Sequence, residues 1–270
     1  MRLGTTSFGF RYSFLDPKLA PPLTAILPAA RKEGVERFQV CENTRPLEMG
    51  PRAWQDAIRC AADLGIELGL GCKTLRASVV QQYIKLAEII PTRRLRIVME
   101  EDDGTHATPE LARKLFAEAV PLLARAGMQL AVENHFDIAS STLLDLAGQY
   151  PADVVGFCVD TANSLRSFEK PSEVLDLLMK RAYCYHLKDF QVVGTKIAFG
   201  VVGAPLGEGH LDLDGCLRRI LAHDGDAEIY AETWTTSVDD RDRDIAAEAD
   251  WLRRSMKNLR DRIAAVTARP

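Results

Sequence analysis

The amino-acid sequence predicts an α/β fold, a single-domain (β/α)₈ TIM barrel that spans residues 1–270. Short apolar runs alternate with longer amphipathic patterns in strict strand-then-helix order, and there are eight of each, the number that closes a barrel. The apolar runs are nearly continuous, as expected for parallel strands that are covered on both faces. Four consecutive runs end in a polar residue, which favours closure over the alternative, an open doubly wound sheet.

The predicted strands are 2–8, 37–41, 67–71, 94–100, 129–133, 154–160, 182–186 and 228–232. The predicted helices are 17–32, 51–64, 78–90, 108–126, 140–149, 171–180, 213–222 and 240–264. The helix at 108–126 is the best marked, because Thr108 is a capping residue, Pro109 suits the first helical position and Gly127 ends the pattern.

The longest irregular stretch, residues 188–210, contains five glycines. In a barrel this stretch is a strand-to-helix loop on the catalytic face. Its apolar part, 190–205, has two readings that the sequence does not separate: part of a lid or subunit contact, or a surface hairpin.

Charge, apolar runs and cysteine spacing argue against several classes of protein. The chain has 270 residues, a formal net charge of −4 and a pI near 5.8. Nucleic-acid binders usually carry a basic face, so nucleic acid is not an expected partner. No apolar run is long enough to span a membrane, and the first residues lack the layout of a signal peptide, so a cytoplasmic protein is expected. The six cysteines form no CxxC pair and are expected to be core residues.

The four strands with polar ends supply a candidate metal cage. They end in turn at Glu133, Asp160, His186 and Glu232. Buried acidic side chains are rare unless they are paired or bind a metal, and three carboxylates that converge on one mouth repel each other. A single divalent cation is the simplest remedy.

The donor set of three carboxylates and one imidazole contains no thiol. It favours Mn²⁺, with Mg²⁺ or Co²⁺ as alternatives, over a structural Zn²⁺. Such an ion polarises a carbonyl group and stabilises an enediolate, and neighbouring carboxylates can then move protons at the adjacent carbon.

Each of these residues also has a structural reading. Asp160 is placed to cap a short turn, His186 to be a satisfied core histidine, and Glu133 to pair with Lys188. Glu42 and Lys73, which close the second and third strands, either line the mouth or are solvated. The four strand ends taken together favour the cage, because active sites gather on the C-terminal face of a barrel.

Five short motifs resemble one known superfamily. They are VENH at 132–135, VDTAN at 159–163, HLKD at 186–189, GEGHLD at 207–212 and AET at 231–233. In order and strand placement the sequence is similar to the xylose-isomerase-like TIM barrel superfamily, which includes sugar-phosphate isomerases and epimerases, ketose 3-epimerases, inosose dehydratases and apurinic endonucleases. The motifs identify the superfamily better than they identify a substrate.

The resemblance implies roles for particular residues. Glu133, Asp160, His186 and Glu232 correspond to metal ligands, and Glu133 and Glu232 also to a catalytic acid–base pair. Five further residues correspond to substrate-binding positions: His135, Asn163, Lys188, Glu208 and His210. Ketose 3-epimerases usually carry an arginine in the loop before the last strand. Here that stretch reads PLGEGH, which is closer to sugar-phosphate epimerases and inosose dehydratases.

Two enzyme classes follow. The first is a metal-dependent isomerase or epimerase of a ketose, sugar acid or sugar phosphate, acting through a metal-stabilised enediolate with two glutamates as acid and base. The second is a lyase on the same scaffold, a dehydratase or decarboxylase of a 3-oxo sugar acid or inosose, with Lys188, Lys73 or His210 as the cation for a substrate carboxylate. In both cases the expected partner is a small carbohydrate, and a homo-oligomer is expected from relatives only. A DNA-repair endonuclease and a non-catalytic barrel are the remaining alternatives.

Overall fold

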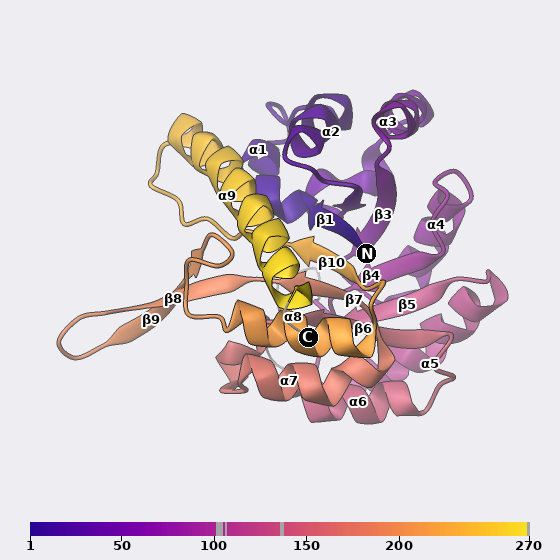
Figure 1. The fold of residues 1–270 in the computed structure, drawn as a ribbon. Coiled ribbons are helices and arrows are strands. Elements are labelled where there is room, and N and C mark those ends of the chain that lie inside the picture. The colour runs from indigo at the N-terminus through magenta and orange to yellow at the C-terminus, as the bar shows by residue number, and fades with distance from the viewer. Residues whose placement is uncertain (101–104, 106, 136–137, 269–270) are drawn as a thin grey trace. The chain divides into compact units, whose positions relative to one another are not determined.

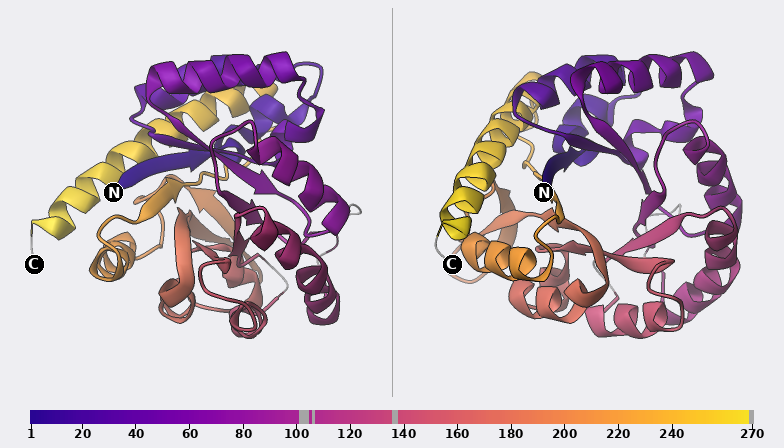
Figure 2. Two further views of the ribbon diagram at one scale, coloured as in Figure 1. Left: turned by 90° about the vertical axis from the view of Figure 1, so that its right-hand side faces the viewer. Right: turned by 45° about the vertical axis from the view of Figure 1, so that its right-hand side comes forward.

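The computed structural model describes residues 1–100, 105, 107–135 and 138–268. The barrel strands within these ranges are β1 (Arg2–Thr6), β2 (Arg37–Val40), β3 (Glu67–Cys72), β4 (Arg94–Ile97), β5 (Gln129–Glu133), β6 (Val155–Asp160), β7 (Ala182–Leu187) and β10 (Glu228–Ala231). They close in the order β1-β10-β7-β6-β5-β4-β3-β2. Figures 1 and 2 draw these strands and the helices around them as ribbons. Neighbouring pairs such as β4 with β5 and β1 with β10 run parallel. The predicted TIM barrel is confirmed, and the open sheet is excluded.

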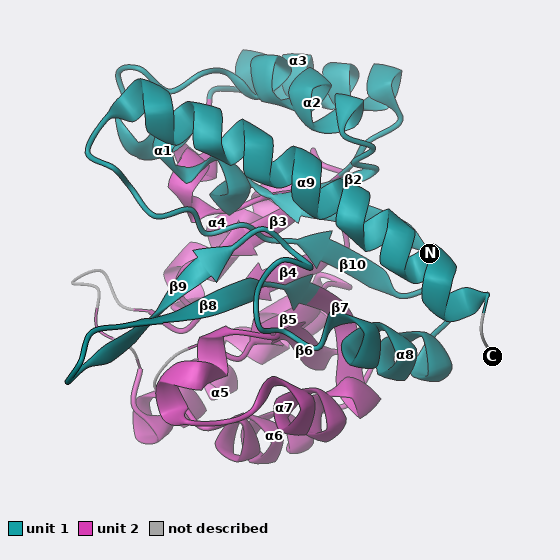
Figure 3. Ribbon diagram, turned by 60° about the vertical axis from the view of Figure 1, so that its left-hand side comes forward, with its two compact units in different colours: residues 1–38, 50–67, 186–270 teal, residues 39–49, 68–185 magenta. Residues whose placement is uncertain are grey.

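The chain divides into two compact units, which Figure 3 colours separately. Unit 1 comprises residues 1–38, 50–67 and 186–270, and unit 2 comprises residues 39–49 and 68–185. The boundaries fall inside β2, β3 and β7, so single strands of the barrel belong partly to each unit.

Unit 1 contains five described helices: α1 (Arg11–Leu15), α2 (Leu23–Lys32), α3 (Pro51–Leu64), α8 (Leu213–His223) and α9 (Arg241–Thr267). Helix α3 matches its prediction, whereas the helix predicted at 17–32 begins only at Leu23. Two successive prolines precede Leu23, and a residue before proline is pushed out of the helical region of backbone space. Trp54 of α3 is buried, as are Leu252 and Met256 on the inner face of α9.

The end of β1 also differs from the prediction, which extended the strand to Phe8. The strand stops at Thr6, whose side-chain oxygen accepts a hydrogen bond from the Phe8 amide (3.2 Å). This bond caps a short 3₁₀ helix, Ser7–Phe10, which runs into α1. Threonine competes for backbone hydrogen bonds in this way at helix starts, so a local side-chain contact ends the strand.

Unit 2 contains α4 (Ala77–Ala87), α5 (Pro109–Arg125), α6 (Ser140–Gly148) and α7 (Pro171–Leu178) among its described residues. The predicted cap of α5 is confirmed, because Thr108 accepts a hydrogen bond from the Leu111 amide (3.2 Å). Every residue of β6 is buried, and Phe116 and Phe157 are among the largest fully buried side chains. Strand β5 has the predicted bounds. Because β6, Phe116 and Phe157 are buried, the ends of β5 and β6 are supported by a well-packed core.

The stretch after β7 forms a two-stranded antiparallel sheet of β8 (Asp189–Gly194) and β9 (Phe199–Ala204). The hairpin reading of 190–205 is thus the one that the structure supports. Its outer part carries exposed apolar side chains, among them Ile197 (97% exposed) and Phe199 (78%). A role in a subunit contact or a lid stays a prediction.

Two statements about composition are tested by the described part of the chain. All six cysteines are free, and all except the half-buried Cys60 are buried, as expected for core residues. None of the helices in the described ranges has the length and apolar character that crossing a membrane requires.

Candidate metal centre and substrate site

The unit 2 part of the site lies at the ends of β5 and β6. Glu133 is the last residue of β5 and Asp160 the last of β6, and both are buried. The Asn134 side chain ties the two strand ends together. Its amide donates to the Asp160 carbonyl (2.9 Å), and its oxygen accepts from the Asp160 amide (2.8 Å). These two bonds fix where both carboxylates emerge.

The Glu133 carboxylate accepts hydrogen bonds at both oxygens. Arg96 Nε of β4 lies 2.5 Å from Oε2, and Asn163 Nδ2 lies 2.7 Å from Oε1. Arg96 is itself buried, with 2% of its side chain exposed, and its Nη1 lies 3.4 Å from the Glu42 carboxylate. An adjacent cation and two donated hydrogen bonds favour the ionised form of a carboxylate. Glu133 is therefore a fixed anion.

Asp160 fulfils the capping role that the sequence allowed. Its Oδ1 accepts hydrogen bonds from the Ala162 amide (2.8 Å) and the Asn163 amide (2.7 Å), at the start of the 3₁₀ helix Asn163–Ser167. The capping and metal readings of Asp160 are compatible, because a carboxylate that caps through one oxygen can coordinate an ion through the other.

The unit 1 part of the site lies at the ends of β7 and β10. His186 of β7 is fully buried, and its Nδ1 lies 2.6 Å from Glu232 Oε2. Lys188 Nζ lies 3.3 Å from Glu232 Oε1. Glu232 directly follows β10, and its backbone amide donates to the Leu187 carbonyl (3.1 Å). A carboxylate is an ordinary partner of a buried histidine, so this contact fits both the core and the metal-ligand reading of His186, and the ligand role stays a prediction.

All four predicted ligands meet the geometric condition for a metal site. Glu133, Asp160, His186 and Glu232 each offer one ligand atom, and these atoms lie within 4.8 Å of one another. All four side chains are buried. Three carboxylates and an imidazole are the donors that Mn²⁺, Mg²⁺ and Zn²⁺ all accept, so the residues present fit one divalent ion, and its identity stays a prediction.

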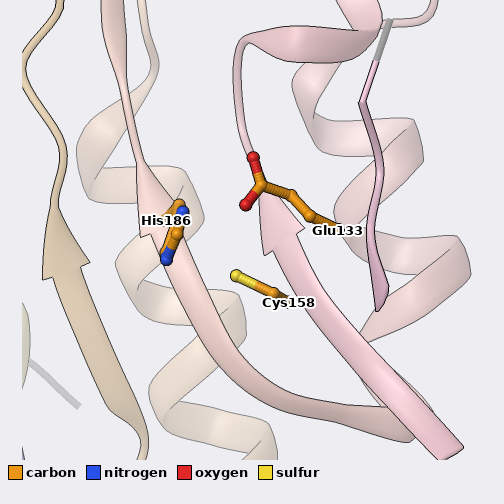
Figure 4. Close-up of side chains that lie close together, drawn as sticks. All are labelled: Glu133, Cys158 and His186. Carbon is orange, nitrogen blue, oxygen red and sulfur yellow. The ribbon is translucent and has the colours of Figure 1, made fainter. Parts of the chain in front are cut away.

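A thiol lies beside this cage. Cys158 of β6 forms a second possible ligand group with Glu133 and His186, and Figure 4 shows the three side chains close together. Burial raises the pKa of the Cys158 thiol well above its usual range. Thiolates, not thiols, bind metals, so the oxygen and imidazole donors are better suited to hold an ion here.

The predicted substrate-binding residues separate into two groups. Asn163 and Lys188 contact the proposed ligands Glu133 and Glu232, and His135 is half-buried two residues after Glu133. Glu208 and His210 are exposed. Their assignment to substrate stays a prediction.

The exposed pair has other contacts in unit 1. Glu208 makes an ion pair with Arg254 of α9 and accepts a hydrogen bond from Asn258 Nδ2 (3.2 Å). Arg254 also holds the pKa of the Glu208 carboxyl below its usual range. The His210 ring stacks on Phe190, with 6.3 Å between ring centroids. The structure thus shows Glu208 holding its loop to α9.

Asp189 has a role that sequence reasoning did not find. Its buried carboxylate accepts four backbone hydrogen bonds, from the amides of Phe190, Gly207, Gly209 and Leu211, at 2.8 to 3.0 Å. A β-carbon on Gly209 would collide with this carboxylate, so glycine is required there. The sequence signal for this role is that HLKD and GEGHLD follow each other closely along the chain. This separation allows Asp189 of the first motif to bind backbone amides of the second.

Arg96 and Glu42 are further residues whose contacts the sequence did not reveal. The sequence allows Glu42 either a mouth-lining or a solvated role, and it predicts only a place in a strand for Arg96. The available signal was the charged Arg96 between the apolar Leu95 and Ile97 of a predicted strand, since a charge among residues expected to be buried needs a partner. Lys73 makes an ion pair with Glu100 (3.4 Å).

Comparison with known proteins identifies the family to which this fold is similar. The model of the family described as xylose isomerase-like TIM barrel matches residues 49–255, which confirms the resemblance. A curated relative, 3-oxo-isoapionate decarboxylase of Pectobacterium atrosepticum, is 26% identical over 260 residues, covering 95% of this chain and 94% of that protein.

Solved structures share the fold at lower identity. The probable 3-DHS dehydratase AsbF of Bacillus anthracis has a TM-score of 0.72 and 17% identity, with 96% of this chain and 99% of that chain covered. The IOLI protein with a bound zinc atom has a TM-score of 0.73 and 14% identity, with 98% and 99% covered. An L-ribulose 3-epimerase has a TM-score of 0.72 and 13% identity, with 99% and 96% covered. The fold therefore occurs in a dehydratase and an epimerase, and the relative is a decarboxylase.

Proposed function

This chain belongs to the xylose isomerase-like TIM barrel family, and we propose that it is a divalent-metal-dependent lyase that decarboxylates a small 3-oxo sugar acid. The observation that carries the proposal is the unequal surrounding of the two glutamates: Glu133 is pinned by Arg96, whereas Glu232 lies beside the ammonium group of Lys188. The full-length similarity to a decarboxylase supports the same class.

Four residues would hold the metal ion: Glu133, Asp160, His186 and Glu232. When bound there, the ion supplies Lewis-acid polarisation of the substrate's ketone oxygen. The surrounding side chains supply the rest of the chemistry. Their burial excludes water, which strengthens electrostatic interactions within the site.

The proton balance of each reaction distinguishes the two enzyme classes. Epimerisation removes a proton from carbon and returns one, so it needs both a base and an acid. Decarboxylation of a 3-oxo acid needs no base: the carbon–carboxylate bond breaks, its electron pair moves toward the ketone, and one proton is added to the carbon. Glu133 suits the second case, because a carboxylate held by Arg96 and Asn163 is a weak proton acceptor.

Lys188 supplies what the decarboxylation needs. Its Nζ lies 3.3 Å from Glu232 and is buried, with 10% of the side chain exposed, so its charge acts in a site of low dielectric. The ammonium group holds the substrate carboxylate in place. After carbon dioxide has left, the same group donates a proton from Nζ to the carbon that carried the carboxylate, and solvent restores that proton.

The isomerase or epimerase class is the second candidate. It is favoured by the presence of two buried glutamates, Glu133 and Glu232, which correspond to the acid–base pair of epimerases in the family. In that case Glu133 would have to leave Arg96 or accept a proton while bonded to it. The substrates would be ketoses, sugar acids or sugar phosphates that keep all their carbon atoms, rather than 3-oxo acids that lose carbon dioxide.

A deuterium experiment tests the proposal. The Mn²⁺-loaded protein is incubated in D₂O with a panel of 3-oxo sugar acids and of ketoses, and carbon dioxide and deuterium are measured. We expect carbon dioxide from an acid, with one deuterium in the product. Deuterium exchange into a ketose without loss of carbon, and no carbon dioxide from any acid, would show the second candidate instead.

Variants of Lys188 assign the charge. Lys188→Met should lower the rate of carbon dioxide release by about 100-fold, because one well-placed proton donor contributes roughly that much. Lys188→Arg keeps the charge and should retain substrate binding, seen as a KM close to that of the wild type, with a reduced kcat. The exposed Lys170→Met is the matched control and should leave both constants unchanged.

A further inference from the structure

The contacts of Glu133 in unit 2 raise a question about how firmly it can bind an ion. Its Oε2 is 2.5 Å from Arg96 Nε, and its Oε1 is 2.7 Å from Asn163 Nδ2. One of these donors is charged and the other is neutral. A metal ion that binds Glu133 therefore shares the carboxylate with a cation that is already there.

The geometry assigns Arg96 the role of a positioning residue that competes with the metal ion for the charge of Glu133 and so keeps the ion weakly held and exchangeable. The inference rests on the proposed function in one respect, that Glu133 is a metal ligand. It adds a function for a residue that is not itself one of the proposed metal ligands.

Burial makes the competition strong. Arg96 has 2% of its side chain exposed and Glu133 has none, so solvent screens their attraction poorly. At a contact distance, the attraction between two unit charges stays strong even at the effective dielectric constant of a protein interior. The same field repels an incoming divalent cation.

A second carboxylate limits the hold of Arg96 on Glu133. Glu42, at the start of the 3₁₀ helix Glu42–Thr44, lies 3.4 Å from Arg96 Nη1 and is partly exposed. Arg96 thus bridges an outer carboxylate and an inner one, Glu42 and Glu133. The ion pair with Glu42 holds the Arg96 guanidinium in place when Glu133 binds a metal ion.

Asn163 provides the contrast that makes the inference testable. Its neutral amide orients Glu133 without opposing the ion, as hydrogen-bonded partners of metal ligands generally do. Removing Asn163 should weaken metal binding. Removing the charge of Arg96 should strengthen it, so two partners of one carboxylate are predicted to have opposite effects.

The experiment measures Mn²⁺ binding by calorimetry on the full chain, stripped of metal and without substrate. We expect Arg96→Gln, and the second neutral variant Arg96→Met, to lower the Kd for Mn²⁺ by about tenfold or more. Arg96→Lys keeps the cation and should leave the Kd within about threefold of the wild type. Asn163→Ala should raise the Kd by about tenfold.

The outcomes separate the inference from the proposed function. A folded Arg96→Gln or Arg96→Met protein that binds Mn²⁺ no more tightly than the wild type overturns the inference, as does a tenfold change in Arg96→Lys. A wild-type protein that binds no Mn²⁺ at all contradicts the proposed function instead. A residue with only a structural role would weaken binding in every variant, in step with a loss of thermal stability.

Discussion

The two glutamates of the candidate metal centre differ in what holds them. Both carboxylate oxygens of Glu133, in unit 2, accept hydrogen bonds, one from Arg96 and one from Asn163. Moving this carboxylate would break its buried ion pair with Arg96. Glu232, in unit 1, faces His186 and a lysine at 3.3 Å. Two glutamates at strand ends are thus suited to different roles. Glu133 supplies a negative charge in a fixed position, and Glu232 lies next to Lys188, the proposed proton donor.

The largest expected difference between the two concerns stability. Glu133→Gln leaves Arg96 buried without a full counter-charge and should lower the free energy of unfolding by about 3 to 5 kcal/mol. Glu232→Gln should cost less, because Lys188 Nζ lies 3.3 Å from Glu232, whereas Arg96 Nε lies 2.5 Å from Glu133. Urea unfolding of both variants in the presence of a chelator measures the difference.

A control accompanies that comparison. Glu173→Gln removes an exposed carboxylate that pairs with Lys170 three residues away, and it should leave the unfolding curve unchanged. Equal losses of unfolding free energy for Glu133→Gln and Glu232→Gln would contradict the proposed difference between the two glutamates.

The loop after Glu232 is connected through Tyr12 to a titratable group, Glu248, whereas Glu133 is held by Arg96 and Asn163. The loop after Glu232 accepts a hydrogen bond from Tyr12 Oη at the Thr235 carbonyl (2.8 Å). The Tyr12 and Ser13 amides in turn donate to Glu248 of α9. Burial raises the pKa of Glu248 from 4.5 to about 7.

The sign of the effect follows from proton linkage. The folded protein keeps the Glu248 proton up to about pH 7, whereas the unfolded chain loses it near 4.5, so the contribution of this group is greatest below pH 4.5. As the pH rises from 4.5 to 7, the wild type should lose about 3 kcal/mol of stability that Glu248→Gln does not lose.

Urea unfolding of the wild type and Glu248→Gln at several pH values in that window measures this difference. Glu118→Gln, on an exposed face of α5, is the control and should follow the wild type. Parallel pH profiles for the wild type and Glu248→Gln would show that this buried carboxylate does not titrate in the window.

The smallest expected effect concerns Glu208, also in unit 1. Its ion pair with Arg254 is partly exposed, so Glu208→Gln should change the free energy of unfolding by no more than about 1 kcal/mol. Because Glu208 contacts α9, KM and kcat for the substrate should change little. A tenfold rise in KM would instead support the substrate contact expected from the sequence.

Local patterns in the sequence located most elements and all four candidate ligands. Strand β5 and helix α3 have the predicted bounds, since a buried apolar run and a proline-to-glycine span leave little freedom. Errors arose where a side chain overrode the pattern, as Thr6 does at the end of β1, or where the pattern lacked a period, as in the hairpin of β8 and β9.

Regular periodicity, caps and the chemistry of strand ends are properties of neighbouring residues, and the sequence by itself therefore determined the barrel and the residues able to hold an ion. Only the tertiary structure decided which partners surround them. Arg96 and Glu133 are 37 positions apart, and Asp189 binds amides up to 22 positions away. Such contacts depend on how distant strands and loops are brought together, so a local pattern can indicate that a residue needs a partner but not which residue supplies it.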